Sequence, residues 1–165
     1  MARRAENMAR FVAKTRAVDP GNAQDLERLF ASGDIFEKLA APMAGLGLRV
    51  DDLADAYALW WISAWNATQG RNDDPSRAMC AAVRGQAARA LRASPAIAGA
   101  SDAAKQEFAE TLLVQMLFID VAVEQSKGKS EQLRELASAV RQGARGMALD
   151  LSSMKLTEAG FVPVR

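Results

Sequence analysis

The stretch TLLVQMLFIDVAV at residues 111–123 decides the fold class, because apolar side chains occupy nearly every face of the helix that it predicts. A helix that is apolar all round is normally buried inside a bundle of other helices. Ser101 precedes this stretch as an N-cap, and Gly128 follows it as a stop signal. We therefore expect a long central helix near residues 102–127.

Two polar residues of this helix, Gln115 and Asp120, are candidates for buried polar side chains. A buried polar group without a partner costs roughly 1–3 kcal/mol, and an unpaired charge costs more. Asp120 would then pair with an arginine or lie at the boundary of the core. The arginines that we consider for this role are Arg84, Arg89, Arg141 and Arg145.

A second helix is predicted by LADAYALWWISAWNAT at residues 53–68, which carries most of the large aromatic side chains. Tyr57, Trp61 and Trp65 recur at a spacing of four and share one face, whereas Trp60 lies about 100° away. These rings either fill the core or line a groove that binds a peptide, glycan or lipid, since aromatic residues are favoured at recognition surfaces. The four aromatic residues are our candidate binding residues.

The rest of the chain also predicts helices separated by Gly, Pro and capping residues. Alanine fills 34 of the 165 positions, which lets helices approach each other closely. We predict an all-α fold, with residues 1–165 forming one domain of about seven helices. Residues 1–17 form an N-terminal helix or arm, and residues 150–165 form an extended tail with at most one more helical turn near 157. The expected N-caps of the other helices include Asp34, Asp51, Asp74 and Ser130.

Several kinds of chemistry are excluded by composition. The absence of histidine excludes Ser–His and Cys–His catalysis and any His-ligated metal site, and the one cysteine, Cys80, excludes an intrachain disulfide. A net charge of +1 does not favour a nucleic-acid partner. No apolar run is long enough to span a membrane, and no phosphate-binding glycine loop occurs. We predict no catalytic residue, no metal and no cofactor.

Taken together, five blocks of sequence resemble an uncharacterised family of exported bacterial proteins that contain a domain of unknown function. The blocks cover most of the chain and are FVAKTRAVDP at 11–20, GLRVDDLADAYALWWISAWNATQG at 47–70, MCAAVRGQAARAL at 79–91, AAKQEFAETLLVQMLFID at 103–120 and LDLSSMKLTEAGFVP at 149–163. Members of that family typically carry a signal peptide, whose apolar segment the first 15 residues here do not show. The resemblance therefore implies a trimmed domain that is periplasmic or secreted, and the alternative is a cytoplasmic protein. It implies no catalytic residues.

We expect a non-enzymatic interaction protein that binds a protein or a cell-envelope component near Trp60, Trp61 and Trp65. One alternative is a carboxylate-dependent enzyme, such as one that cleaves glycans, which needs a cleft around a carboxyl group with a raised pKa. The carboxylates available for it are Asp55, Glu107, Glu110 and Asp120. Another alternative is a small carrier that holds an apolar ligand in a cavity between helices.

Overall fold

The computed structural model describes residues 2–164, and over this range the chain is mainly helical, which confirms the all-α class. The predicted long helix is α7. The helices are α1 (Ala2–Val18), α2 (Pro20–Ala31), α3 (Ile35–Gly45), α4 (Leu53–Thr68), α5 (Arg77–Ala93), α6 (Pro95–Ala98), α7 (Asp102–Ser126) and α8 (Ser130–Gly146). A short 3₁₀ turn at Leu151–Ser153 leads into two strands, β1 (Met154–Thr157) and β2 (Gly160–Pro163).

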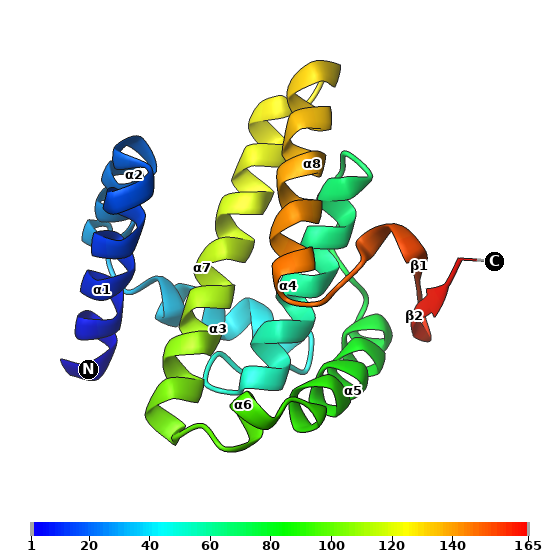
Figure 1. The fold of residues 1–165 in the computed structure, drawn as a ribbon, viewed down its shortest axis with the longest axis horizontal. Coiled ribbons are helices and arrows are strands. Elements are labelled where there is room, and N and C mark those ends of the chain that lie inside the picture. Colours follow the sequence, from blue (N-terminus) through cyan, green and yellow to red (C-terminus); the bar gives the residue numbers. More distant parts are fainter. Residues whose placement is uncertain (1, 165) are drawn as a thin grey trace.

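Helix α4 lies at the centre of the main bundle, where it contacts α5, α7 and α8 (Figure 1). Every residue of α4 from Asp55 to Thr68 is buried. Alanines such as Ala56, Ala58 and Ala64 are fully buried and let the neighbouring helices come close. Helix α7 is buried along the face toward α4, but Gln115 and Val121 are exposed, so the prediction that 111–123 is buried on all sides is only partly correct.

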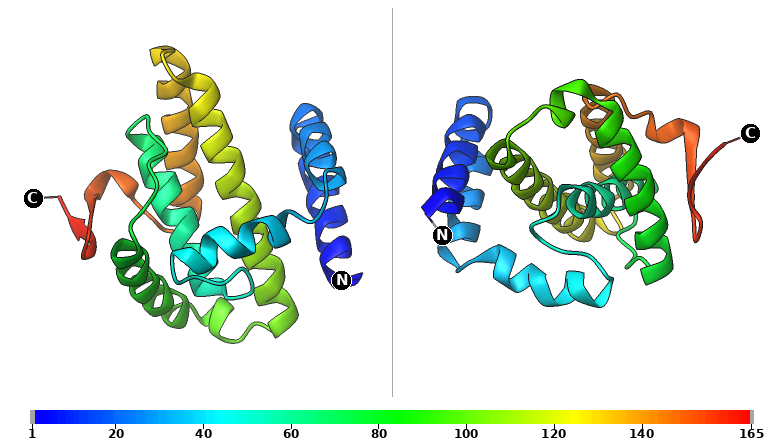
Figure 2. Two further views of the ribbon diagram at one scale, coloured as in Figure 1. Left: turned by 180° about the vertical axis from the view of Figure 1, so that it is seen from behind. Right: turned by 90° about the horizontal axis from the view of Figure 1, so that it is seen from below.

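Helices α1 and α2 form an antiparallel hairpin that lies at one side of the bundle, next to α7 (Figures 1 and 2). Met8 and Val12, which lie four residues apart on one face of α1, are buried in this hairpin. Asp19 caps α2 by accepting a hydrogen bond from the backbone N–H of Asn22. The connection to α3 then leads the chain across to the bundle.

Two of the predicted N-caps are confirmed. The Asp34 carboxylate accepts the backbone N–H groups of Phe36 and Glu37, and the Ser101 hydroxyl accepts that of Ala104. Three other N-caps lie one or two residues from their predicted positions. The side chain of Asp52 caps α4 instead of Asp51, and that of Ser76 caps α5 instead of Asp74. Helix α8 begins at Ser130, so Lys129 occupies its N-cap position.

The C-terminal segment is a β-hairpin instead of the predicted extended tail with a helical turn. Strands β1 and β2 pair antiparallel, with Lys155 opposite Val162. The Gln86 side chain of α5 accepts the backbone N–H of Phe161 at 2.9 Å and donates to its C=O at 2.7 Å, in the manner of a third strand. Gly160 has φ +96°, and a Cβ there would lie 2.7 Å from Oε1 of Gln86, so the turn requires glycine.

Within residues 2–164, no helix combines the length and apolar character that crossing a bilayer requires.

Candidate functional site

The four aromatic residues predicted to bind a ligand are all buried, with exposed fractions of 3–7%. Tyr57 packs against Trp60 and Trp61, with ring centroids 5.8 and 5.9 Å apart. Trp61 also stacks on Phe161 of β2 at 4.6 Å. Burial raises the pKa of Tyr57 to about 12. Most of this aromatic surface therefore forms the core and joins the β-hairpin to the bundle.

The three indole N–H groups differ in their partners. Nε1 of Trp61 donates to Sδ of Met154 at 3.2 Å, and Nε1 of Trp65 donates to the Met154 carbonyl at 3.0 Å. Nε1 of Trp60 is buried and has no hydrogen-bond partner among the described residues. A buried donor without a partner costs about 1–3 kcal/mol. Trp60 is thus the one tryptophan whose polar atom is unsatisfied.

Trp60 lines a groove between the α1–α2 hairpin and the bundle, which we call the hairpin groove. The groove has a volume of about 610 Å³ and is formed by α1, α2, α4, α7 and α8. None of its lining residues is charged. They are Phe11, Thr15, Asn22, Leu26, Trp60, Gln115, Phe118, Ile119, Ala139, Val140, Gly143, Gly146 and Met147.

Gln115 lies on the α7 side of this groove and is exposed, so the prediction that it is buried is wrong. The physical reason is that no helix packs over this part of α7, because the hairpin and α8 stand on either side of it. The two other polar residues, Thr15 and Asn22, already donate to Phe11 O and to Asp19. Gln115 is therefore the groove's accessible polar group, and the unsatisfied Trp60 N–H is buried in a residue of its wall.

The α8 wall of the hairpin groove consists of small residues, which the analysis of the sequence missed. Ala139, Gly143 and Gly146 share one face of the helix at spacings of four and three. A Cβ built on Gly143 or Gly146 would meet no atom within 4 Å. Their periodic spacing was the signal that an open face lies along α8.

Charged side chains attach α1 of the hairpin to the N-terminal half of α7, away from the hairpin groove. Glu110 is 1% exposed, and its carboxylate accepts hydrogen bonds from Nε of Arg4 at 3.1 Å, Nδ2 of Asn7 at 2.7 Å and Nε2 of Gln106 at 2.9 Å. Glu107, one helical turn away, pairs with Arg10 at 3.0 Å. This arginine lowers the pKa of Glu107.

The other carboxylates considered for catalysis are Asp55 and Asp120. Asp55 is 2% exposed and accepts the backbone N–H of Arg49 and the guanidinium of Arg84, although burial still raises its pKa. Asp120 is half-buried and accepts the hydroxyl of Ser63. Asp120 thus lies at the boundary of the core, which was one of the two predicted alternatives, and no arginine among the described residues pairs with it, since Arg84 pairs with Asp55. Burial and the charge of Asp74 raise the pKa of Asp120.

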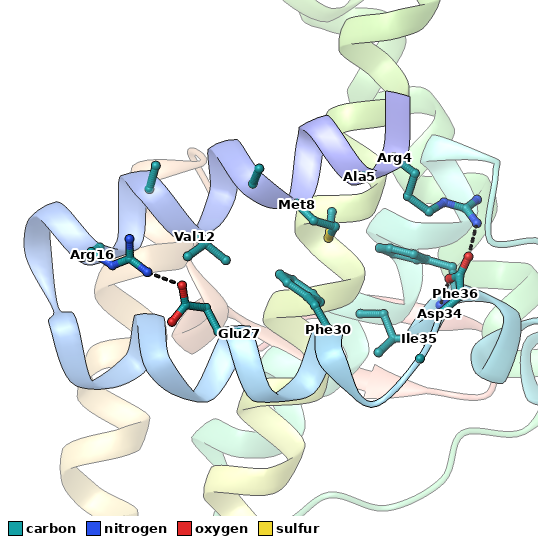
Figure 3. Close-up of a pocket in the computed structure, with 13 residues that line it drawn as sticks. Arg4, Ala5, Met8, Val12, Arg16, Glu27, Phe30, Asp34, Ile35 and Phe36 are labelled. Carbon is teal, nitrogen blue, oxygen red and sulfur yellow. Dashed lines mark hydrogen bonds and ion pairs between the residues drawn. The ribbon is translucent and has the colours of Figure 1, made fainter. Parts of the chain in front are cut away.

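A second apolar hollow lies between α1 and α2, with a volume of about 710 Å³ (Figure 3). Its floor consists of apolar side chains, and an ion pair stands at each end: Arg16 with Glu27, and Arg4 with Asp34. The Arg4 guanidinium also lies 4.8 Å from the centre of the Phe36 ring. The charged groups of this cleft are already paired with each other, so it offers fewer unmet interactions than the hairpin groove.

Metal and thiol chemistry find little support in the part of the chain that is described. No group of three or more acidic or cysteine side chains is placed to hold a metal ion within residues 2–164. Cys80 is fully buried, and this burial raises the pKa of its thiol to about 11, so the reactive thiolate is not formed at neutral pH.

Comparison with known proteins places this arrangement in a family. No curated protein and no solved structure matches the chain. Residues 4–163 match the family of unknown function DUF6683, a range that includes nearly all of α1, every other helix and the C-terminal strands. The chain therefore belongs to the family of unknown function DUF6683.

Proposed function

We propose that this protein is a non-enzymatic binding protein of the bacterial cell envelope that holds an uncharged, mainly apolar envelope component in the hairpin groove. The proposal rests on the composition of the groove lining. The groove has no charged lining residue, and its buried Trp60 N–H has no partner. The resemblance to exported bacterial proteins supports a periplasmic or secreted location.

The chemistry of the groove defines the ligand. A charged group entering it would lose water without gaining a counter-charge, which is costly. An apolar chain or ring would instead cover Phe11, Phe118 and Ile119. The Gln115 amide would serve one polar atom of the ligand, and a carbonyl or ether oxygen would accept the buried N–H of Trp60 once neighbouring side chains move aside. The volume of about 610 Å³ lies in the range of small-molecule sites.

The contacts of three of the four candidate carboxylates support binding over hydrolysis, whereas Asp120 lines a different pocket. Asp55, Glu107 and Glu110 each accept an arginine in a contact between separate segments of the chain. These three carboxylates therefore act as structural ion-pair partners, and the arginines favour their charged form, whereas a general acid must be protonated. None of them lines the hairpin groove.

Titration with Nile red, an uncharged apolar dye that has a carbonyl acceptor and fluoresces strongly out of water, tests the proposal. Gly143→Leu should weaken binding at least tenfold, because the new side chain fills the groove. It should not unfold the protein, since Gly to Leu in a helix gains about 0.5–1 kcal/mol of propensity. Trp60→Phe should weaken binding about 2- to 10-fold through the lost hydrogen bond.

Gly45→Leu is the matched control, because Gly45 is also helical and exposed, with no atom within 4 Å of its Cβ, but lies outside the groove. It should bind Nile red as the parent does. Equal binding by the parent and by Gly143→Leu would show that the groove is not the site. Failure of the parent to bind both Nile red and neutral lipids extracted from the cell envelope would reject the small-ligand proposal.

A further inference from the structure

A separate pocket of about 210 Å³ lies where α3, the loop at 72–75 and α7 meet α4. We call it the α3–α7 pocket. Its walls are mostly apolar, with side chains that include Leu39, Met43, Ile62, Met116 and Leu117. Its polar and acidic lining residues are Ser63, Asn66, Asn72, Asp73, Asp74 and Asp120. It shares no residue with the hairpin groove.

The carboxylate of Asp120 in this pocket has no counter-charge among the lining residues. Asp120 accepts a hydrogen bond from the Ser63 hydroxyl, which is a neutral donor. No lysine or arginine lines the pocket, and the carboxylate of Asp74 is close enough to disfavour ionisation of Asp120 further. Asp73 does have a cation, because Arg71 reaches its carboxylate at 3.1 Å. Within residues 2–164, Asp120 is thus a half-buried acid without a basic partner.

Asn66 adds an independent observation. Its side chain is 4% exposed, and its Nδ2 donates to the backbone C=O of Asp73 at 3.1 Å. This bond orients the amide, and its Oδ1 accepts no hydrogen bond from the described residues. Because Asn66 lines the same pocket as Asp120, its amide oxygen is an unused acceptor in the pocket lining. The polar end of the pocket therefore offers acceptors and lacks the donors to match them.

We propose that the α3–α7 pocket binds a small organic ammonium ion, with the ammonium group on Asp120 and Asn66 and the carbon chain against the apolar walls. A primary ammonium carries three donors and no acceptor, which complements this set of oxygens. A charged donor on a carboxylate makes one of the stronger hydrogen bonds. A bare metal ion fits less well, since the apolar walls supply no ligands. The proposal is independent of the hairpin groove.

Titration of the purified protein with n-butylammonium chloride, followed by amide chemical shifts in NMR spectra, tests this proposal. We expect shifts centred on Ser63, Asn66 and Asp120. Asp120→Asn keeps the shape and the Ser63 contact but removes the charge, and it should weaken binding about tenfold or more. Asp25→Asn removes an equal charge from an exposed ion pair far along the chain and should bind as the parent does.

n-Butanol and calcium chloride are the comparison ligands. Binding of butanol as tightly as of butylammonium would show that the pocket recognises only the apolar chain, and it would overturn the proposal. Stronger shifts with calcium at the same residues would assign an inorganic cation instead. Unchanged affinity of Asp120→Asn, or the absence of shifts with butylammonium at any concentration, would also overturn it.

Discussion

Helices α1 and α4 have almost the same length, 17 and 16 residues, but they are held in the molecule by different forces. Fourteen residues of α4 are buried. Of the described side chains of α1, only Asn7, Met8 and Val12 are buried. Helix α4 therefore packs through apolar contacts on all sides, whereas α1 packs on α2 and is tied to α7 by the carboxylates of Glu107 and Glu110.

The difference in burial between α1 and α4 explains how the hairpin groove forms. Apolar burial contributes about 25 cal/mol per Å², so the bundle around α4 is strongly cohesive. The hairpin buries few side chains of α1, and it is held to α7 by the buried Glu110 and by exposed ion pairs of Glu107 that contribute about 0–1 kcal/mol each, so it is attached more weakly. Attachment at the Glu110 end leaves the hairpin apart from α8 and keeps the groove open. We infer that the α1–α2 hairpin opens at a lower free energy than the bundle.

The largest expected effect comes from breaking the bundle. Trp61→Ala removes the ring that stacks on Phe161 and contacts Tyr57, so the whole protein should lose about 3–5 kcal/mol of unfolding free energy. Urea denaturation monitored by circular dichroism measures this loss. A loss below about 1 kcal/mol would mean that α4 is not the centre of the core.

Breaking the attachment of the hairpin should have an intermediate and local effect. Glu110→Gln leaves Arg4 without its buried carboxylate, which should cost about 1–3 kcal/mol, discounted because Arg4 is partly exposed. Hydrogen exchange should increase in α1 and α2 and stay unchanged in α4. Glu107→Gln, which breaks more exposed pairs, is the control and should cost less than about 1 kcal/mol. Uniform acceleration of exchange throughout the chain would contradict a separate hairpin.

Two tryptophans offer a matched comparison of a satisfied and an unsatisfied indole. Trp65→Phe leaves the Met154 carbonyl without its donor and should cost about 1–2 kcal/mol beyond the lost volume. Trp60→Phe removes an unpaired donor, so its loss of packing should be largely offset and the net change should stay within about 1 kcal/mol. Thermal melts of both variants give the comparison. A greater loss for Trp60→Phe would show that its N–H has a partner.

The smallest effect concerns the pH dependence of Asp120. Its raised pKa means that the folded protein holds this proton at a pH where the unfolded chain has lost it, so its contribution to stability falls as pH rises through that range. Asp120→Asn should therefore raise the melting temperature slightly at pH 7 and leave it unchanged at a pH below the ordinary aspartate pKa. A lower melting temperature at pH 7 would mean that the carboxylate is stabilising.

Local signals predicted most of the helices, because caps and apolar periodicity act within a few residues. Asp34 and Ser101 cap α3 and α7 as their positions indicated, and the apolar run of α7 does lie against the core. The β-hairpin was missed because its strands depend on Gln86, 75 residues away. No short-range pattern carries that contact.

The candidate site was only partly predictable for the same reason. The sequence places Trp60 on a different helix face from Trp61 and Trp65, but it does not show that Met154 satisfies only the latter two indoles. Gln115 sits in an apolar helix and was expected to be buried, but burial depends on whether another helix covers it. The hairpin stands apart there because its ion pairs lie at the other end of α7.

Hydrogen–deuterium exchange at low salt and at about 1 M NaCl, where charges are screened within about 3 Å, tests most directly whether the hairpin is a separately opening unit. The predicted result is that α1 and α2 exchange at a lower opening free energy than α4 and α7, and that salt accelerates exchange in the hairpin alone. One opening free energy shared by all four helices, with no response to salt, would contradict this account.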